Sequence, residues 1–215
     1  MAGDRWATFD CYGTLIDWNG GIRRELARVF GEDRGDEQLD RYHEIEPELQ
    51  AGGRRTYREV MTEAMRRLGA SDGDAGALAA ALPSWKPFPE VRSALEQARS
   101  RGWNLAILSN TDRDFIEASM RRIGVPFELA IVASEIGSYK PDLRHWLAFF
   151  EETHASRDRH VHVAQSHFHD IVPANELRLR TIWINRYDER HEPPPTRELS
   201  DLSQLPDTLD ELVSD

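Results

Sequence analysis

The sequence predicts a doubly wound α/β protein that carries an inserted helical domain. Five short β-type runs are spread along the chain, and segments with a helical pattern precede the last four of them. Strands that alternate with helices indicate a parallel sheet covered by helices on both faces. At 215 residues, with 40% hydrophobic and 30% charged residues, the chain has room for a sizeable core and a smaller insertion.

The strands and helices of the core are expected in alternating order. The strands are expected at Trp6–Phe9, Asn104–Leu108, Leu129–Val132, His160–Val163 and Thr181–Ile184. The intervening helices are expected at Glu90–Arg101, Asp114–Ile123, Leu143–Thr153 and Ile171–Leu177. The polar stretch Tyr187–Leu205, with its three consecutive prolines, is predicted to be an exposed loop, followed by a short helix from about Pro206.

The region between the first two strands contains only helical patterns. Apolar residues recur at helical spacing from about Trp18 to Pro83, for example Tyr57, Val60, Met61 and Ala64. A connection of roughly 65 residues is too long for a simple crossover. We therefore predict a helical cap domain at residues 17–85 and a core domain at residues 1–16 and 86–215.

Composition limits the classes of partner. No apolar run approaches the roughly 18 residues of a membrane span, and the N-terminus lacks the layout of a secretory signal. One cysteine fits a reducing compartment, so the expected location is the cytoplasm. A net charge of -11 argues against nucleic-acid binding but still allows a small anionic substrate, since a few cations can dominate a closed pocket.

Polar residues follow four of the five predicted strands. Asp10 follows the first, Ser109 and Asn110 the second, and Gln165 to Asp170 the fourth, while the third leads to Lys140. Ligands of open parallel sheets bind at the carboxyl ends of the strands. The order and placement of these residues therefore predict one site.

These segments resemble the haloacid dehalogenase superfamily, in particular its type II (L-2-haloacid) dehalogenases. The resemblance covers essentially the whole chain and rests on Phe9–Leu15, Leu108–Thr111, Tyr139–Pro141, His169–Ala174 and Trp183–Arg186. It implies a Rossmann-like core of five parallel strands with a cap. It also implies that Asp10 is a nucleophile that forms an aspartyl ester.

The remaining catalytic roles follow from charge. Lys140 is the cation that positions Asp10, and Thr14 and Ser109 supply hydroxyl donors. Asp170 either holds Lys140 or orients the water that hydrolyses the ester. The structural alternatives are a strand-end cap for Asp10, a surface position for Lys140 and a helix N-cap for Asp170.

Tyr12 and Gln165 distinguish between reactions. Phosphatases of this superfamily carry an acid two residues after the nucleophile to protonate an alkoxide, whereas a departing halide needs no proton. Magnesium-dependent relatives carry a carboxylate at the position of Gln165, and magnesium favours carboxylates. We therefore expect carbon–halogen cleavage without a metal or other cofactor. A magnesium-dependent phosphatase and a ligand-binding relative without turnover are the alternatives.

The predicted substrate contacts are Tyr12, Arg41, Asn110, Trp146, Gln165 and His167. Arg41 of the cap is the expected halide-binding residue, with Arg54 and Arg55 as rivals. Trp146, Gln165 and His167 replace the Tyr, Ser and Asn that are usual in the dehalogenases, which leaves the substrate open. The first two of the histidines at 160, 162, 167 and 169 are expected away from Asp10, so zinc is disfavoured. Cys11 is expected to be packed. Dimers occur in the family, so a homodimer is compatible with the resemblance.

Overall fold

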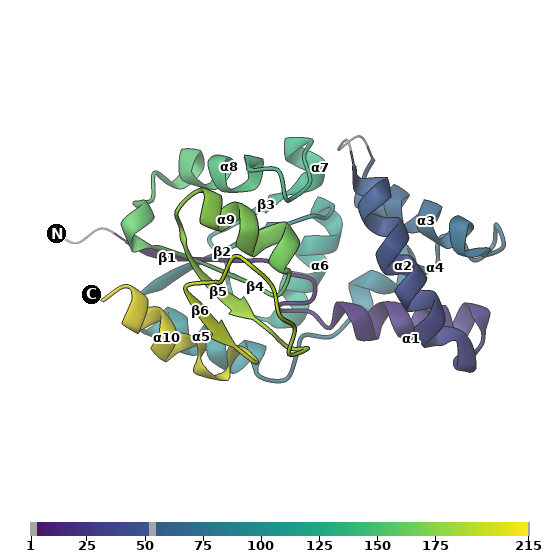
Figure 1. The fold of residues 1–215 in the computed structure, drawn as a ribbon, viewed down its shortest axis with the longest axis horizontal. Coiled ribbons are helices and arrows are strands. Elements are labelled where there is room, and N and C mark those ends of the chain that lie inside the picture. The colour runs from purple at the N-terminus through teal and green to yellow at the C-terminus, as the bar shows by residue number, and fades with distance from the viewer. Residues whose placement is uncertain (1–3, 52–54, 215) are drawn as a thin grey trace.

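A six-stranded parallel sheet forms the centre of the protein (Figure 1). The computed structural model describes residues 4–51 and 55–214. The strands, in the spatial order β3-β2-β1-β4-β5-β6, are β1 Arg5–Phe9, β2 Trp103–Ser109, β3 Leu129–Val132, β4 His160–Ala164, β5 Arg180–Ile184 and β6 Arg197–Leu199. The chain proceeds outward from β1 to β3 and then restarts at β4 on the other side of β1. The strand order therefore reverses between β1 and β4, where open α/β sheets bind ligands.

The five predicted strands are confirmed, but the prediction of a five-stranded sheet is wrong. The sixth strand, β6, lies in the stretch predicted to be a loop and pairs with β5 as the edge of the sheet. Thr181 and Thr196 hold its start, since the backbone N–H of each donates to the side-chain oxygen of the other at 3.0 Å. With only three residues, two of them charged and exposed, β6 lacks the apolar alternation that marks a strand.

Helices cover both faces of the sheet. They are α5 Val91–Ser100, α6 Arg113–Ile123, α7 Ala133–Ile136, α8 Arg144–Thr153, α9 Val172–Glu176 and α10 Leu205–Leu212. Along β2, Leu105 and Ile107 belong to the same buried cluster as residues of α5, α6 and α10, whereas Ala106 and Leu108 pack with Trp146 of α8. This alternation follows from the two-residue period of a strand. It gives the doubly wound core that the sequence predicts.

The connection between β1 and α5 is helical. It contains α1 Trp18–Phe30, η1 Glu32–Arg34, α2 Gly35–Gln50, α3 Tyr57–Leu68, α4 Ala77–Ala81 and η2 Leu82–Ser84. Figure 1 shows α1 to α4 together at one end of the molecule, beyond the sheet. The assignment of residues 17–85 to a separate cap domain remains a prediction, which this arrangement favours.

The two chain segments that join these helices to the sheet run side by side. The backbone N–H of Phe88 donates to the carbonyl of Leu15 at 3.0 Å, and that of Asp17 donates to the carbonyl of Lys86 at 2.9 Å. Asp17 also begins α1, because its side chain accepts a hydrogen bond from the N–H of Gly20. The helical insertion therefore leaves and re-enters the core at one place.

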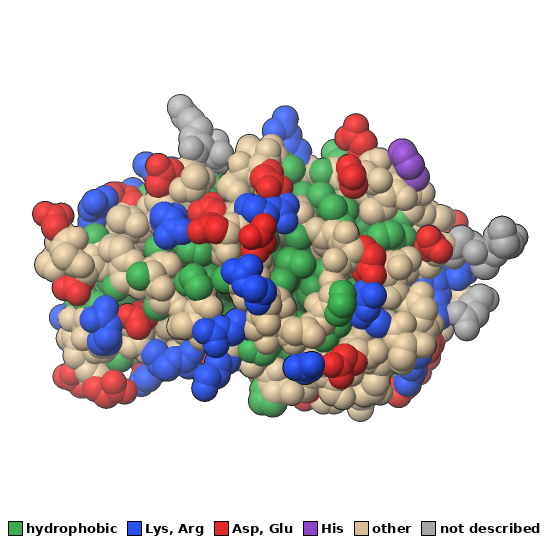
Figure 2. All heavy atoms as spheres, turned by 180° about the vertical axis from the view of Figure 1, so that it is seen from behind, with side chains coloured by type: hydrophobic (Ala, Val, Ile, Leu, Met, Phe, Trp, Pro, Cys, Tyr) green, Lys and Arg blue, Asp and Glu red, His purple; other side chains and the backbone are tan. Residues whose placement is uncertain are grey.

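Charges of both signs are spread over the surface. Figure 2 shows acidic and basic side chains interspersed on the face opposite to that of Figure 1, with hydrophobic side chains between them. Within residues 4–51 and 55–214, no helix is long and apolar enough to cross a membrane.

Candidate active site

A cavity of about 290 Å³ lies at the carboxyl ends of the central strands, beneath the cap helices. Its core side is lined by Asp10, Tyr12, Gly13, Ser109, Asn110, Lys140, Gln165, Ser166, His169, Asp170, Tyr187 and Glu189. Its cap side is lined by Trp18, Asn19, His43, Glu46, Pro47, Gln50 and Tyr57. The cavity thus occupies the place where the strand order reverses.

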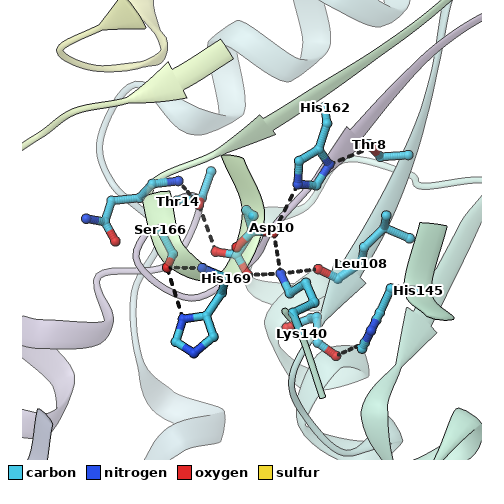
Figure 3. Close-up of polar contacts among 12 residues, drawn as sticks. Thr8, Asp10, Thr14, Leu108, Lys140, His145, His162, Ser166 and His169 are labelled. Atoms are coloured by element: carbon cyan, nitrogen blue, oxygen red, sulfur yellow. Dashed lines mark hydrogen bonds and ion pairs between the residues drawn. The ribbon is translucent and has the colours of Figure 1, made fainter. Parts of the chain in front are cut away.

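Asp10 lies where β1 ends and the chain turns. Its backbone N–H still donates to Val163 of β4 at 3.1 Å, which fixes the residue at the end of the sheet. The hydroxyl of Thr14 donates to Oδ2 of Asp10 at 2.8 Å, and the ammonium of Lys140 lies 3.0 Å from Oδ1 (Figure 3). The side chain is only 10% exposed, so both carboxylate oxygens are held within the cavity wall.

Lys140 links Asp10 to Asp170. Its Nζ donates to Asp10 at 3.0 Å, to Asp170 at 2.6 Å and to the carbonyl of Leu108 at 2.9 Å. These three bonds use all three N–H groups of a lysine. Lys140 is 2% exposed and Asp170 is 1% exposed, so this is a buried ionic cluster.

The protonation of this cluster follows from burial and mutual charge. Burial raises the pKa of Asp10, while Lys140 and Thr14 act in the opposite direction. Burial alone would lower the pKa of Lys140, but the two carboxylates outweigh it and raise that pKa. Burial would also raise the pKa of Asp170, but Lys140 and the hydrogen bond from His162 lower it to about 2. Asp170 is therefore a firmly ionised partner of Lys140 and a weak base.

A chain of hydrogen bonds supports Asp170 from inside the sheet. His162 Nε2 lies 2.9 Å from Oδ1 of Asp170, and its Nδ1 lies 2.8 Å from the hydroxyl of Thr8. The same hydroxyl lies 2.9 Å from Nε2 of His160. The expectation that both strand histidines lie away from the site is wrong for His162. In the described part of the chain, no group of three or more His, Cys, Asp or Glu side chains is arranged to hold a metal.

Ser109 ends β2 and Asn110 follows it, and both line the cavity. The side chain of Asn110 bonds to the backbone of Lys140 twice, accepting from its N–H at 2.6 Å and donating to its carbonyl at 3.0 Å. The buried hydroxyl of Ser109 has no hydrogen-bond partner among the described residues. An unpaired buried hydroxyl in a cavity wall is suited to a bound ligand.

Gln165 supports the turn that follows Asp10 with its backbone and with its side chain. Its N–H donates to the hydroxyl of Thr14 at 2.9 Å, which orients that hydroxyl toward Asp10. Its side-chain oxygen lies 3.1 Å from where a Cβ on Gly13 would stand. Gly13 has a φ of +93°, a backbone conformation that favours glycine, and the oxygen of Gln165 leaves little space for a side chain there.

Tyr12 lines the cavity with its ring. Its hydroxyl lies 3.0 Å from that of Ser119 on α6, and its ring stacks on Tyr57 of the cap with centroids 6.3 Å apart. Burial raises the pKa of Tyr12 well above its usual value. The hydroxyl is therefore tied to a partner in the wall and is a poor proton donor.

Three predicted substrate contacts do not line the cavity. Arg41 lies on a different side of α2, where its guanidinium is 3.4 Å from the side chain of Gln38. Trp146 is fully buried against the sheet, with its ring 5.1 Å from that of His162. His167 bonds to the carbonyl of Pro193 at 2.8 Å, outside the cavity lining. Of the rivals to Arg41, Arg54 lies outside the described residues, and Arg55 bonds to the carbonyl of Leu49 at 3.4 Å.

Other residues occupy the cavity instead. Ser166 and His169 line it, and they are joined by a 3.0 Å contact between the hydroxyl and Nδ1. Burial lowers the pKa of His169 to about 4, so its imidazole is neutral near pH 7. The sequence signal for both was their position in the segment that ends at Asp170. Glu46 and Gln50 of the cap also line the cavity, and no motif pointed to them.

Comparison with known proteins identifies the family. The model of haloacid dehalogenase-like hydrolases matches residues 5–166. Haloacetate dehalogenase H-2 of Moraxella is 30% identical over 192 residues, covering 83% of this chain and 84% of that protein. (S)-2-haloacid dehalogenase 4A of Burkholderia cepacia is 25% identical over 219 residues, covering 97% and 93%.

A solved structure shares the fold. The L-2-haloacid dehalogenase of Xanthobacter autotrophicus with chloropropionic acid covalently bound superposes with a TM-score of 0.84 at 18% identity, over 96% of this chain and 98% of that one. The likeness extends over the sheet and the inserted helices, since nearly the whole of both chains is covered.

Proposed function

We propose that this chain, which belongs to the haloacid dehalogenase-like hydrolase family, cleaves the carbon–halogen bond of a small 2-haloacid. The observation that carries the proposal is the environment of Asp10, a buried carboxylate held by Lys140 and Thr14 and facing a cavity. No carboxyl group stands two residues later, because Tyr12 occupies that position. The names of the Moraxella and Burkholderia relatives support the same reaction.

In the first step, a carboxylate oxygen of Asp10 attacks the carbon that bears the halogen. The new carbon–oxygen bond forms as the carbon–halogen bond breaks, and the halide leaves with the electron pair. Lys140 and Thr14 hold the attacking carboxylate in one orientation. The carboxylate therefore loses little conformational entropy when it reaches the transition state. The covalently bound chloropropionic acid in the Xanthobacter protein supports an intermediate of this kind.

In the second step, water attacks the carboxyl carbon of the aspartyl ester. One proton of the water goes to the oxygen of the departing substrate and the other is released to the solvent. The ester bond breaks, the 2-hydroxyacid leaves, and the carboxylate of Asp10 is restored. Lys140 stabilises the negative charge that develops on the ester oxygen, because its ammonium already lies 3.0 Å from Asp10. Asp170 acts through Lys140, which it fixes by a 2.6 Å ion pair.

Small polar groups of the core are suited to the substrate carboxylate. We assign this role to the hydroxyl of Ser109, which has no partner among the described residues. Asn110 lines the cavity beside it, and the two N–H groups of its amide bond to Lys140 and Gln50. The ring of Tyr12 supplies a wall for the carbon chain. Its hydroxyl is bound in that wall, so a reaction that needs an acid for its leaving group is disfavoured.

The side chains present do not fit a magnesium site well. The ammonium of Lys140 lies between the carboxylates of Asp10 and Asp170 and bonds to both. Gln165 offers an amide where a carboxylate would suit the ion better. We therefore propose a reaction that uses no cofactor.

The test is halide release by the purified protein from chloroacetate and from both enantiomers of 2-chloropropionate, with and without EDTA. We expect release that EDTA leaves unchanged and that the Asp10→Asn variant loses. Asp207→Asn is the matched control, since Asp207 is 75% exposed and pairs with Arg101. Phosphate release from an aryl phosphate that needs magnesium, without halide release, would assign the phosphatase reaction instead.

Location and assembly are part of the same proposal. We infer a reducing compartment, and hence the cytoplasm, from the single cysteine, which is buried. Size-exclusion chromatography with light scattering tests whether the protein is a homodimer.

A further inference from the structure

The cap side of the cavity presents a carboxyl group to the substrate. Glu46 of α2 lines the cavity and is 7% exposed. The hydroxyls of Tyr57 and Tyr42 both donate to its Oε1, at 2.7 and 3.5 Å. The indole N–H of Trp18 donates to the oxygen of Tyr57 at 2.9 Å, so the proton of that hydroxyl is directed to Glu46. Glu46 is therefore fixed in place by side chains of three cap helices.

Gln50, beside Glu46, bonds to the core. Gln50 follows one turn later on α2, and its side-chain oxygen accepts from Asn110 at 3.3 Å. The Gln50 side chain also lies close enough to Glu46 to act on the pKa of its carboxyl group. The carboxyl group therefore lies on the wall opposite to Asp10, next to a glutamine that bonds to the core at the end of β2.

The charge of the cavity makes this carboxyl group consequential. Among the described lining residues the only lysine or arginine is Lys140, and its three N–H groups are occupied by Asp10, Asp170 and a carbonyl. A 2-haloacid brings a further carboxylate, and its halogen becomes an anion as it departs. An ionised Glu46 would repel both, whereas a neutral Glu46 would offer an O–H donor.

We propose that Glu46 selects the charge of the substrate: as a carboxylic acid it admits an anion to the cavity, and as a carboxylate it excludes one. The inference deepens the proposed function and rests on it only for the identity of the anion. Since both tyrosines donate to Oε1, the proton of the acid form is carried by Oε2. Glu46 is thus a specificity-determining residue rather than a nucleophile or a base.

The surroundings of Glu46 place its titration near neutral pH. Burial raises its pKa to about 7, although the hydrogen bonds from Tyr57, Tyr42 and Gln50 act in the opposite direction. The titratable groups on the cap side are Tyr42, His43 and Tyr57, with Tyr139 of the core nearby. Those across the cavity are Asp10, Lys140, His169, Asp170 and Glu189, with Tyr12 and Tyr187 at its walls.

The test is the binding of propionate, which lacks a halogen and cannot react, measured by calorimetry at pH 6, 7 and 8 and constant ionic strength. A group with a pKa of about 7 is mostly protonated at pH 6 and about one-tenth protonated at pH 8. We therefore expect propionate to bind more weakly as the pH rises, with a Kd about tenfold higher at pH 8 than at pH 6. Neutral propionamide should bind with a constant Kd.

Two variants complete the test. Glu46→Gln is neutral at every pH and keeps a donor, so its Kd for propionate should stay at the low-pH value throughout. Glu48→Gln is the matched control, because Glu48 lies on the same helix but is exposed and pairs with Arg67 at 3.1 Å. It should follow the wild type.

Three binding results would overturn the proposal, and so would one kinetic result. The binding results are a propionate Kd that does not change between pH 6 and 8, a pH dependence that persists in Glu46→Gln, and the failure of propionate to bind any form at any pH. A turnover rate that rises through pH 7 and is lost in Glu46→Gln would make Glu46 a base and also overturn it. Propionate binding needs no turnover, so the two proposals can fail separately. If the Kd of propionate changes with pH as expected but no 2-haloacid releases halide, the proposed reaction is wrong and the role of Glu46 is supported.

Discussion

Replacement of Asp170 by asparagine tests whether the buried ionic cluster stabilises the fold. Asp170 is fully buried and bonds to both Lys140 and His162. Burial of a carboxylate is unfavourable, while its two partners favour the ionised form. The pKa of Asp170 falls from 3.8 to about 2, so the partners outweigh burial.

The size of the effect follows from this pKa. A depressed carboxyl pKa contributes stability above the pKa of the unfolded chain, and this stability is lost as the pH falls toward the pKa of the folded state. A decrease of nearly two pH units corresponds to about 2 kcal/mol. For a chain of this size we expect a Tm roughly 4–8 °C lower for Asp170→Asn at pH 7.

The assay is urea unfolding at pH 7 and at several pH values down to about 2. The difference in unfolding free energy between wild type and Asp170→Asn should be about 2 kcal/mol at pH 7 and should shrink between about pH 4 and pH 2. Asp207→Asn, at the exposed pair with Arg101, should change stability little. A variant as stable as the wild type at pH 7 would refute the reasoning, since burial would then cancel the pairing.

Three further predictions concern the cavity and the cap. Glu46→Gln should become more stable than the wild type as the pH rises from 5 to 8, by up to about 3 kcal/mol in urea unfolding. The reason is that Glu46, with a pKa raised to about 7, lowers the unfolding free energy of the wild type over this interval. Parallel curves of unfolding free energy against pH for the two proteins would contradict this. Gly21→Ala should lower the unfolding free energy by about 1–3 kcal/mol, since a Cβ would lie 2.4 Å from the ring of Trp85. The control Gly76→Ala, with no atom within 4 Å of the new Cβ, should show no such loss in thermal melts. Tyr12→Phe should release halide at close to the wild-type rate, because its hydroxyl is bound in the wall; a hundredfold slower rate would show that the hydroxyl takes part in the reaction.

The residues that follow the strands could be placed from the sequence because topology places them. Parallel strands end at the same edge of a sheet, so Asp10, Ser109 and Asp170 converge whatever the details of packing. Lys140 reaches the same point from the connection after β3. Periodicity is enough to find the first five strands, β1 to β5, whereas β6 is held by pairing with β5 and has no pattern of its own.

The cap side of the cavity could not be predicted in the same way. The buried residues of α2 are Gly35, Gln38, Tyr42, Glu46, Leu49 and Gln50, and three of them carry an amide or a carboxyl group. Which stripe of this helix faces the core depends on its packing against α1 and α3, and local sequence does not specify that packing. Arg41, one residue before Tyr42, therefore suggested the wrong side of the helix.

The predictions for Trp146 and His167 failed for a similar reason, because local packing decides which way each side chain points. Trp146 lies six residues after Lys140, but α8 turns that position toward the sheet, where Trp146 packs with Leu108 and Phe149. The segment before α9 forms a π-helical turn, η4 (His167–Ile171), which places His169 in the cavity and His167 outside it. A π turn changes which residues share a face, and no residue pattern in this segment indicates such a turn.

The most direct test of the account is the fate of water oxygen in a single turnover. Enzyme in excess over 2-chloropropionate would react in ¹⁸O-labelled water, and the peptide that contains Asp10 and the hydroxyacid would then be weighed by mass spectrometry. If Asp10 forms an ester that water cleaves at the carboxyl carbon, the label enters Asp10 and the product keeps unlabelled oxygen. Label in the product of this first turnover, with Asp10 unlabelled, would mean that water attacks the substrate directly and would contradict the account.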